Sequence, residues 1–104
     1  MKNLFQEIPP ADAEEFFETL AETGQVRIER IVSRGHSAPA QGWFDADETE
    51  WVALLRGAAR LEFEDGRKLR LGPGDWLEIP AHCRHRVAWT VPDRETVWLA
   101  VHFL

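Results

Sequence analysis

The fold of this chain is decided by residues 72–87, which read GPGDWLEIPAHCRHRV. Residues 72–75 predict a sharp turn, because proline fixes φ while glycine leaves it free. The apolar run 76–79 predicts a short strand, which Pro80 ends since it has no N–H to donate to a ladder. A second strand begins with His85. A histidine on the apolar face of a strand after such a break is a candidate for a site inside a small β-barrel.

The remainder of the chain predicts an all-β fold. From residue 25 onward, hydrophobic residues recur with a two-residue period in short segments that turns separate. Asp65-Gly66 is the strongest hairpin signal in the chain. About seven or eight short strands at regular spacing indicate a sandwich or a barrel.

Residues 12–23 predict one short α-helix before these strands. Asp12 is a suitable N-cap, and Glu15 three residues later completes a capping box. Gly24 is a suitable C-cap. We therefore expect a helix that packs on the wall of the barrel.

Composition limits the classes of protein to consider. The chain has 104 residues, so we expect one domain (1–104), with a lead-in and helix over 1–24 and a barrel over 25–104. A net charge of −6 without a basic cluster argues against nucleic acid as a partner. The lone Cys83 excludes an internal disulfide, and no apolar run is long enough for a signal or a membrane span. We expect a cytoplasmic protein with no membrane partner.

Two stretches resemble the motifs of the cupin family. Its second motif, G-x5-P-x-G-x2-H-x3-N, is matched by Gly74, Pro80 and His85. The second half of its first motif, E-x6-G, is matched by Glu50 and Gly57. In the second motif, His82 replaces the last glycine and Trp89 replaces the asparagine. In the first motif, no His-x-His precedes Glu50. The two histidine positions fall on Trp43 and Asp45 if the spacer before Glu50 has four residues, and on Phe44 and Ala46 if it has three.

The resemblance implies a double-stranded β-helix, or jelly roll, with a site inside the barrel mouth. In the metal-bearing members, the ligands are the two histidines and the glutamate of the first motif and the histidine of the second. Glu50 and His85 match directly, and Asp45 is the one substitute that can ligate, through a carboxylate oxygen. The predicted metal site is Asp45, Glu50 and His85, holding divalent Mn, Fe, Zn or Ni.

Further residues are candidates for the same site. His102 and His82 are the predicted acid–base groups, the first on the last strand and the second at the rim. Trp43, Trp51 and Trp89 are predicted to wall a substrate pocket, since ligand sites are largely apolar. The alternative interpretation is structural: a core histidine bonded to the backbone, a solvated turn carboxylate and core tryptophans.

Two functional hypotheses stay open at this point. The first is a metal-dependent enzyme, a dioxygenase or isomerase, acting on a small molecule. The second, motivated by the missing His-x-His, is a metal-free small-molecule-binding or sensor module in which Glu50 and His85 orient the ligand. Because the segments 50–55 and 96–103 are apolar on both faces, we also expect a homodimer.

Overall fold

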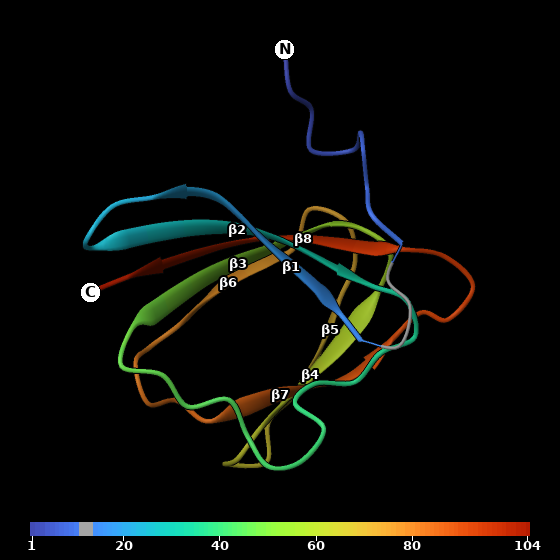
Figure 1. Ribbon diagram of the computed structural model, residues 1–104. Helices are drawn as coiled ribbons and strands as arrows, with labels where there is room; N and C mark the ends of the chain where they lie inside the picture. The colour runs from blue at the N-terminus through green and yellow to red at the C-terminus, as the bar shows by residue number, and fades with distance from the viewer. Residues whose placement is uncertain (11–13) are drawn as a thin grey trace.

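The structure, a computed structural model, describes residues 1–10 and 14–104, which form two antiparallel β-sheets facing each other (Figure 1). The larger sheet has the strand order β1-β2-β8-β3-β6, and the smaller has the order β5-β4-β7. This confirms the predicted all-β class. The strands are β1 (Phe16–Glu22), β2 (Val26–Ser33), β3 (Thr49–Arg56), β4 (Ala59–Phe63), β5 (Lys68–Leu71), β6 (Trp76–Ile79), β7 (His85–Thr90) and β8 (Thr96–Phe103).

The turn at residues 72–75 forms as its sequence predicts. The amide of Asp75 donates to the carbonyl of Gly72 over 3.1 Å, and the amide of Gly72 donates to the Asp75 carboxylate over 2.7 Å. Gly74 has a φ of 91°, which a residue with a side chain rarely adopts. The strand that follows ends at Ile79, directly before Pro80. This turn and break place β6 in the larger sheet and β7 in the smaller one.

The predicted helix over 12–23 is wrong, because β1 occupies most of this segment and no helix occurs among the described residues. Asp12, its predicted N-cap, lies outside them. The strand instead forms a hairpin with β2. The Thr23 hydroxyl closes the turn by accepting the amides of Gln25 and Val26 over 3.2 and 3.1 Å. Pairing along an entire neighbouring strand therefore outweighs a local helix signal.

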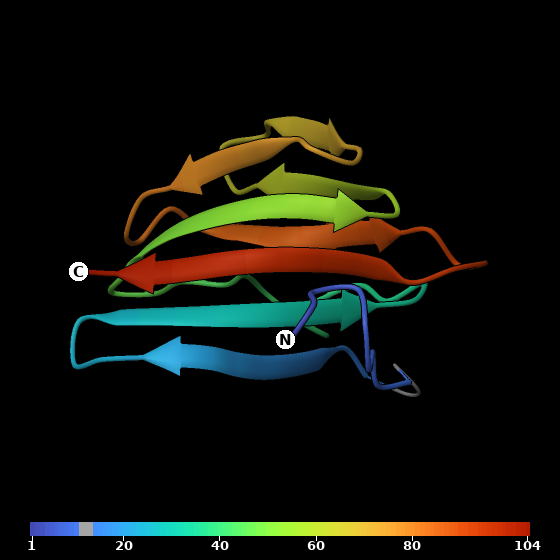
Figure 2. The ribbon, with the colours of Figure 1, turned by 90° about the horizontal axis from the view of Figure 1, so that it is seen from above.

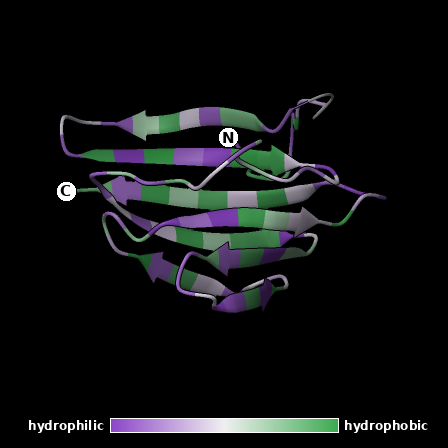
Figure 3. Cartoon of the chain, turned by 90° about the horizontal axis from the view of Figure 1, so that it is seen from below, coloured by the Kyte–Doolittle hydropathy of each residue, from purple (hydrophilic) through white to green (hydrophobic). Residues whose placement is uncertain are grey.

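The core lies between the two sheets, where their inner faces meet. Leu54 and Trp98 contribute from the larger sheet, and Leu61 and Phe63 contribute from the smaller one; all four are at most 4% exposed. Figure 3 shows hydrophobic residues alternating with hydrophilic ones along the strands, as expected when one face of each strand is buried. No helix among the described residues is long and apolar enough to cross a membrane.

The N-terminal segment crosses the outer face of the larger sheet (Figure 2). It is held there by Arg30 of β2, which is only 5% exposed. The Arg30 guanidinium donates to the carbonyls of Leu4, Gln6 and Glu7 over 3.2, 2.9 and 3.1 Å and pairs with Glu18 over 2.8 Å. These partners compensate the burial of the charge through the two terminal nitrogens, while Nε of Arg30 is buried without a hydrogen-bond partner among the described residues.

The segment between β2 and β3 runs beside β7 and closes one side of the barrel. It forms isolated bridges between Ala38 and Val87 and between Phe44 and His85. The Phe44 amide donates to the His85 carbonyl over 2.7 Å, and the reverse bond measures 3.2 Å. The bridge fixes Phe44 against the first residue of β7.

Candidate functional site

A cavity of about 140 Å³ lies between the two sheets. Apolar side chains form most of its wall, and the ionisable groups in its lining are glutamates, histidines and one cysteine. The lining residues are Glu15, Phe17, Glu29, Ile31, Phe44, Ala46, Glu48, Glu50, Val52, Leu61, Ile79, Pro80, Cys83, His85, Val87, Trp98 and His102. Glu50 and His85, which the sequence analysis singled out, are both among them.

His85 enters the cavity from the start of β7. Its Nδ1–H donates to the carbonyl of Cys83 over 2.8 Å, and its Nε2 lies 3.4 Å from Oε1 of Glu50. Its ring packs against Phe44 and Phe63, with centroids 5.6 and 6.1 Å apart. Both nitrogens therefore face an oxygen that can only accept, which favours the doubly protonated imidazolium.

The pKa of His85 reflects the same contacts. Burial lowers it, but the hydrogen bonds to Glu50 and to the Cys83 carbonyl, together with the attraction of the Glu50 charge, outweigh burial. The pKa is consequently raised above its ordinary value of 6.5.

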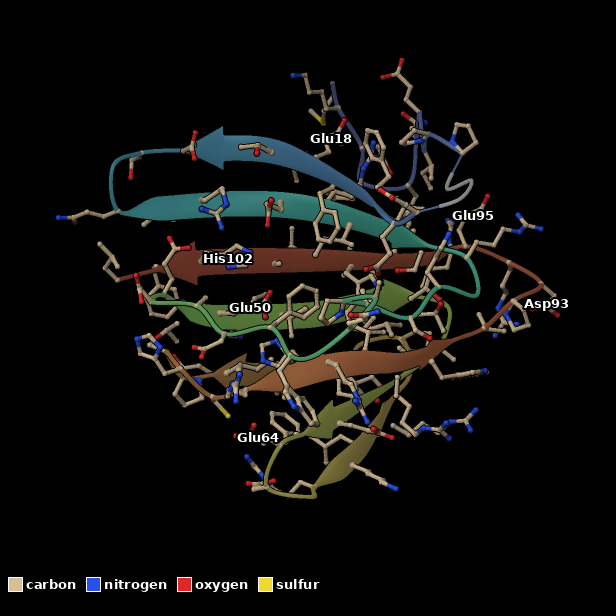
Figure 4. The ribbon with its side chains drawn as sticks, turned by 60° about the horizontal axis from the view of Figure 1, so that its bottom comes forward. Glu18, Glu50, Glu64, Asp93, Glu95 and His102 are labelled. Carbon is tan, nitrogen blue, oxygen red and sulfur yellow. The ribbon has the colours of Figure 1, made fainter. Side chains whose placement is uncertain are left out.

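His102 extends this arrangement on the larger sheet. The register places it opposite Glu50 of β3 and opposite Arg27 of β2. Its Nε2 donates to Oε1 of Glu29 over 2.7 Å and lies 3.7 Å from Oε2 of Glu50. Figure 4 shows Glu50 and His102 on adjacent strands, on the face turned toward the smaller sheet. The four side chains form a line of alternating carboxylate and imidazole, Glu29–His102–Glu50–His85, which we name the interior polar chain.

The interior polar chain has the groups that proton transfer requires. A carboxylate can accept a proton, and an imidazolium beside it can donate one. Side-chain exposures of 12% for His85 and 19% for Glu50 limit screening by water. Glu29 is not among the residues predicted from the sequence, because the charged residues of its strand are interleaved with apolar ones, as on a solvated strand face. Its shared face with Ile31 was the available signal.

Asp45 and His82 lie together at the rim, outside the cavity lining. Oδ1 of Asp45 lies 2.9 Å from Nδ1 of His82, and its Oδ2 lies 3.5 Å from Arg84. Nε2 of His82 is 3.2 Å from Asp47. The hydrogen bond to Asp45 and the charges of both carboxylates raise the pKa of His82. The predicted metal set of Asp45, Glu50 and His85 is therefore not brought together, because Asp45 is bound to rim cations.

The three predicted pocket tryptophans also lie outside the cavity lining. Trp43 stacks under the guanidinium of Arg86, 4.4 Å from its ring centroid. Trp51 follows the inward-facing Glu50, so strand alternation turns it outward. Trp89 pairs with Arg60 because a bulge in the β4–β7 register moves it off the face of His85. The tryptophan that does line the cavity is Trp98.

The family's metal-ligand positions can now be assigned. Phe44 and Ala46 line the cavity, so they occupy the two positions that are histidines in the family's first motif. Neither side chain has an atom that can bind a metal ion. Among the described residues, no group of three or more His, Cys, Asp or Glu side chains is arranged to hold a metal ion. The polar side chains contact one another in sequence rather than converge on one point. The residues of this site therefore do not fit the metal centre that the family implies.

The comparisons with known proteins agree with this fold. The family model of the cupin domain matches residues 31–102, so the chain belongs to the cupin family. None of the curated proteins compared with the chain matches it.

Solved structures with the same fold are numerous. A candidate mannose-6-phosphate isomerase from Ralstonia eutropha JMP134 is similar, with 45% identity, a TM-score of 0.92 and coverage of 99% of this chain and 96% of that one. A cupin superfamily protein from Desulfitobacterium hafniense DCB-2 has 24% identity, a TM-score of 0.73 and coverage of 99% and 96%. An RmlC-like cupin with a double-stranded β-helix fold from Methanocaldococcus jannaschii has 18% identity, a TM-score of 0.74 and coverage of 93% and 86%. The last two support the fold alone.

Proposed function

We propose that the cavity between the sheets binds a compact small molecule against its apolar walls and the Glu50 carboxylate. The observation that carries this proposal is the interior polar chain along one wall of the cavity. Ligand sites combine apolar walls with a few polar groups that fix orientation, and this cavity has that composition.

The donor chemistry favours the metal-free hypothesis over the metal-dependent one. Phe44 and Ala46 supply no ligand atom where the family has histidines, and Asp45 is engaged by His82 and Arg84. We therefore propose that ligand binding is independent of a divalent metal.

The test is a binding screen by NMR on chelator-treated protein, using compounds of up to about eight non-hydrogen atoms, the size that suits a small cavity. Ligands should shift resonances of cavity residues such as Val52 and Leu61. The variant Ala46→Phe fills part of the cavity and should weaken binding at least about tenfold, a change of about 1.4 kcal/mol. The same substitution at the exposed Ala21 is the control. Binding that appears only with added Mn, Fe, Zn or Ni contradicts the proposal, as does binding that Ala46→Phe leaves unchanged.

Proton-transfer isomerisation is a second candidate function, favoured by the 3.4 Å contact between His85 and Glu50 inside the cavity. The similar Ralstonia structure is a candidate isomerase. Glu50 would take a proton from a carbon next to a carbonyl, and the His85 imidazolium would give one to the carbonyl oxygen. Dihydroxyacetone in heavy water is a suitable small probe: enzyme-dependent deuterium incorporation, lost in Glu50→Gln, is expected. Incorporation no faster than in buffer rejects this reaction for the probe.

We further propose that the predicted homodimer forms through the outer face of the larger sheet. Outward positions on its strands are largely apolar. Trp76 is 61% exposed, and its ring lies tilted against that of Trp51, with centroids 5.6 Å apart. Five strands about 4.8 Å apart and roughly 20 Å long give a face of roughly 500 Å² in projection. Projecting side chains bring its accessible area toward the roughly 800 Å² per partner of a stable interface. The N-terminal segment crosses this face over β2, where Arg30 holds it, and reaches β3, where the Arg56 guanidinium lies 4.5 Å from the centroid of the Phe5 ring. The proposed interface is the rest of the face, around Trp51 and Trp76.

Light scattering coupled to size exclusion tests the dimer. The wild type should elute as a dimer, and Trp51→Glu should convert it to a monomer. Trp89→Glu, on the outer face of the smaller sheet, is the matched control and should stay dimeric. A wild type that is monomeric at high concentration contradicts the proposal.

A further inference from the structure

Glutamates outnumber all other ionisable residues in the cavity lining. Besides two histidines and a cysteine, every ionisable residue that lines it is a glutamate, and none of the described lining residues is a lysine or an arginine. An anionic ligand would thus meet no permanently charged cation on these walls. The two N–H groups of the His85 imidazolium are directed at the Cys83 carbonyl and at Glu50, so a phosphate or carboxylate entering the cavity would lose hydration with few donors to replace it.

Glu50 is the member of the interior polar chain with acceptor capacity left. Its contacts with His85 and His102 measure 3.4 and 3.7 Å, longer than the 2.7 to 2.9 Å of a strong charge-assisted hydrogen bond. Glu29, in contrast, accepts from His102 over 2.7 Å. The two oxygens of Glu50 can therefore accept further N–H donors from a ligand.

A positive group of the chain itself already occupies the edge of this site. The guanidinium of Arg27 lies 3.2 Å from Oε1 of Glu48 and 3.7 Å from Oε2 of Glu29. Both glutamates line the cavity. The carboxylates at that edge therefore attract a positive charge. The aromatic rings of Phe44, Phe17 and Trp98 in the wall also favour a cation.

We propose that the cavity selects a compact ligand with a protonated amine or guanidinium on an apolar body, and rejects phosphate esters and carboxylates. This rests on the proposed function, that the cavity binds a small molecule. The ligand's N–H groups donate to Glu50, and its apolar part contacts Val52, Leu61 and Ile79. A volume of about 140 Å³ is below the usual range of ligand pockets, which also disfavours a hexose phosphate.

The test compares ligands of equal length and different charge on the chelator-treated full chain. Butylamine, 1-butanol and butyrate are titrated by NMR, with mannose 6-phosphate as a larger anion. Butylamine should bind about tenfold more tightly than 1-butanol, or about 1.4 kcal/mol, and neither anion should shift the cavity resonances.

Two charge variants test the source of this preference. Glu50→Gln should remove most of the tenfold advantage of butylamine while leaving 1-butanol unchanged. Glu48→Gln, at the more exposed edge of the cavity, should reduce the advantage of butylamine over 1-butanol by a smaller factor. It provides the test if Glu50→Gln does not fold. Glu78→Gln on β6 lies outside the cavity lining, is the matched control and should have no effect.

The outcomes separate the two proposals. Binding of butyrate or mannose 6-phosphate in the cavity as tightly as butylamine overturns the charge selection and leaves the proposed function standing. An amine preference that survives both charge variants also overturns the selection by Glu50. Absence of cavity shifts with every compound overturns the proposed function and the charge selection together.

Discussion

Two leucines of equal burial should differ in how much stability they contribute. Leu54 and Leu61 are 0% and 2% exposed, and both belong to the hydrophobic core. Leu61 lines the cavity, whereas Leu54 does not. Substituting each by alanine removes the same three carbon atoms but leaves a different space behind.

The magnitudes follow from transfer and cavity contributions. Loss of three buried carbons costs about 2.4 kcal/mol at either position. At Leu54 a closed void of up to about 80 Å³ adds about 2 kcal/mol, for a total of about 4 kcal/mol. At Leu61 the removed volume merges with a cavity that already exists, so little is added and the total stays near 2.5 kcal/mol.

Urea denaturation of the wild type, Leu54→Ala and Leu61→Ala, followed by tryptophan fluorescence, measures both free energies of unfolding. The wild type in the same buffers gives the slope of the free energy of unfolding against urea concentration, and this slope should be the same for all three proteins. Equal losses at the two positions, or a larger loss at Leu61, would refute the inference that an open cavity adjoins Leu61. They would remove the physical basis of the binding proposal as well.

Three further outcomes are expected. Glu50→Gln should lower the pKa of His85, because burial and the hydrogen bond to the Cys83 carbonyl remain while the hydrogen bond and the charge of Glu50 are lost; NMR titration of the ring protons checks this, and an unchanged pKa speaks against it. Because the pKa of His85 is raised in the folded protein, the wild type should be more stable than His85→Gln by its full amount below pH 6.5, and this advantage should disappear as pH rises through the folded pKa. Urea titrations at several pH values measure it, and an advantage that grows with pH would contradict the ion pair. Gly57→Ala should cost about 2 to 4 kcal/mol in thermal or urea unfolding, because φ is +95° and the added Cβ would lie 2.4 Å from Oγ1 of Thr96 and 2.7 Å from its Cα; a neutral substitution would disagree with this close approach.

Local turn chemistry explains why much of the fold could be predicted from the sequence. The turn at 72–75, the break at Pro80 and the Asp65-Gly66 hairpin each depend on residues whose backbone preferences are strong. In the hairpin the Gly66 amide donates to the carbonyl of Phe63 over 2.9 Å. Strand pairs formed from such turns need little information from distant parts of the chain. The helix predicted over the segment Phe16–Glu22 is wrong because the local capping pattern carries no information on pairing with β2, the next strand in the chain.

The site was predictable only where strand alternation holds without interruption. Glu50 and His85 lie on uninterrupted inward faces, and both line the cavity. Trp89 does not, because a bulge at Ala88 of β7, opposite the step from Arg60 to Leu61, turns Trp89 to the other face of the strand. Glu29 shares a strand face with the apolar Ile31, but its contact with His102 follows only from the pairing of β2 with β8.

The buried guanidinium of Arg30 makes the start of the chain depend on the sheet beneath it. Three backbone carbonyls of the first seven residues find their donor only on a strand whose neighbours are already in place. The sheet itself pairs this guanidinium with Glu18, and the carbonyls of Leu4, Gln6 and Glu7 accept its other hydrogen bonds, so deleting residues 4–7 leaves these donors without protein partners.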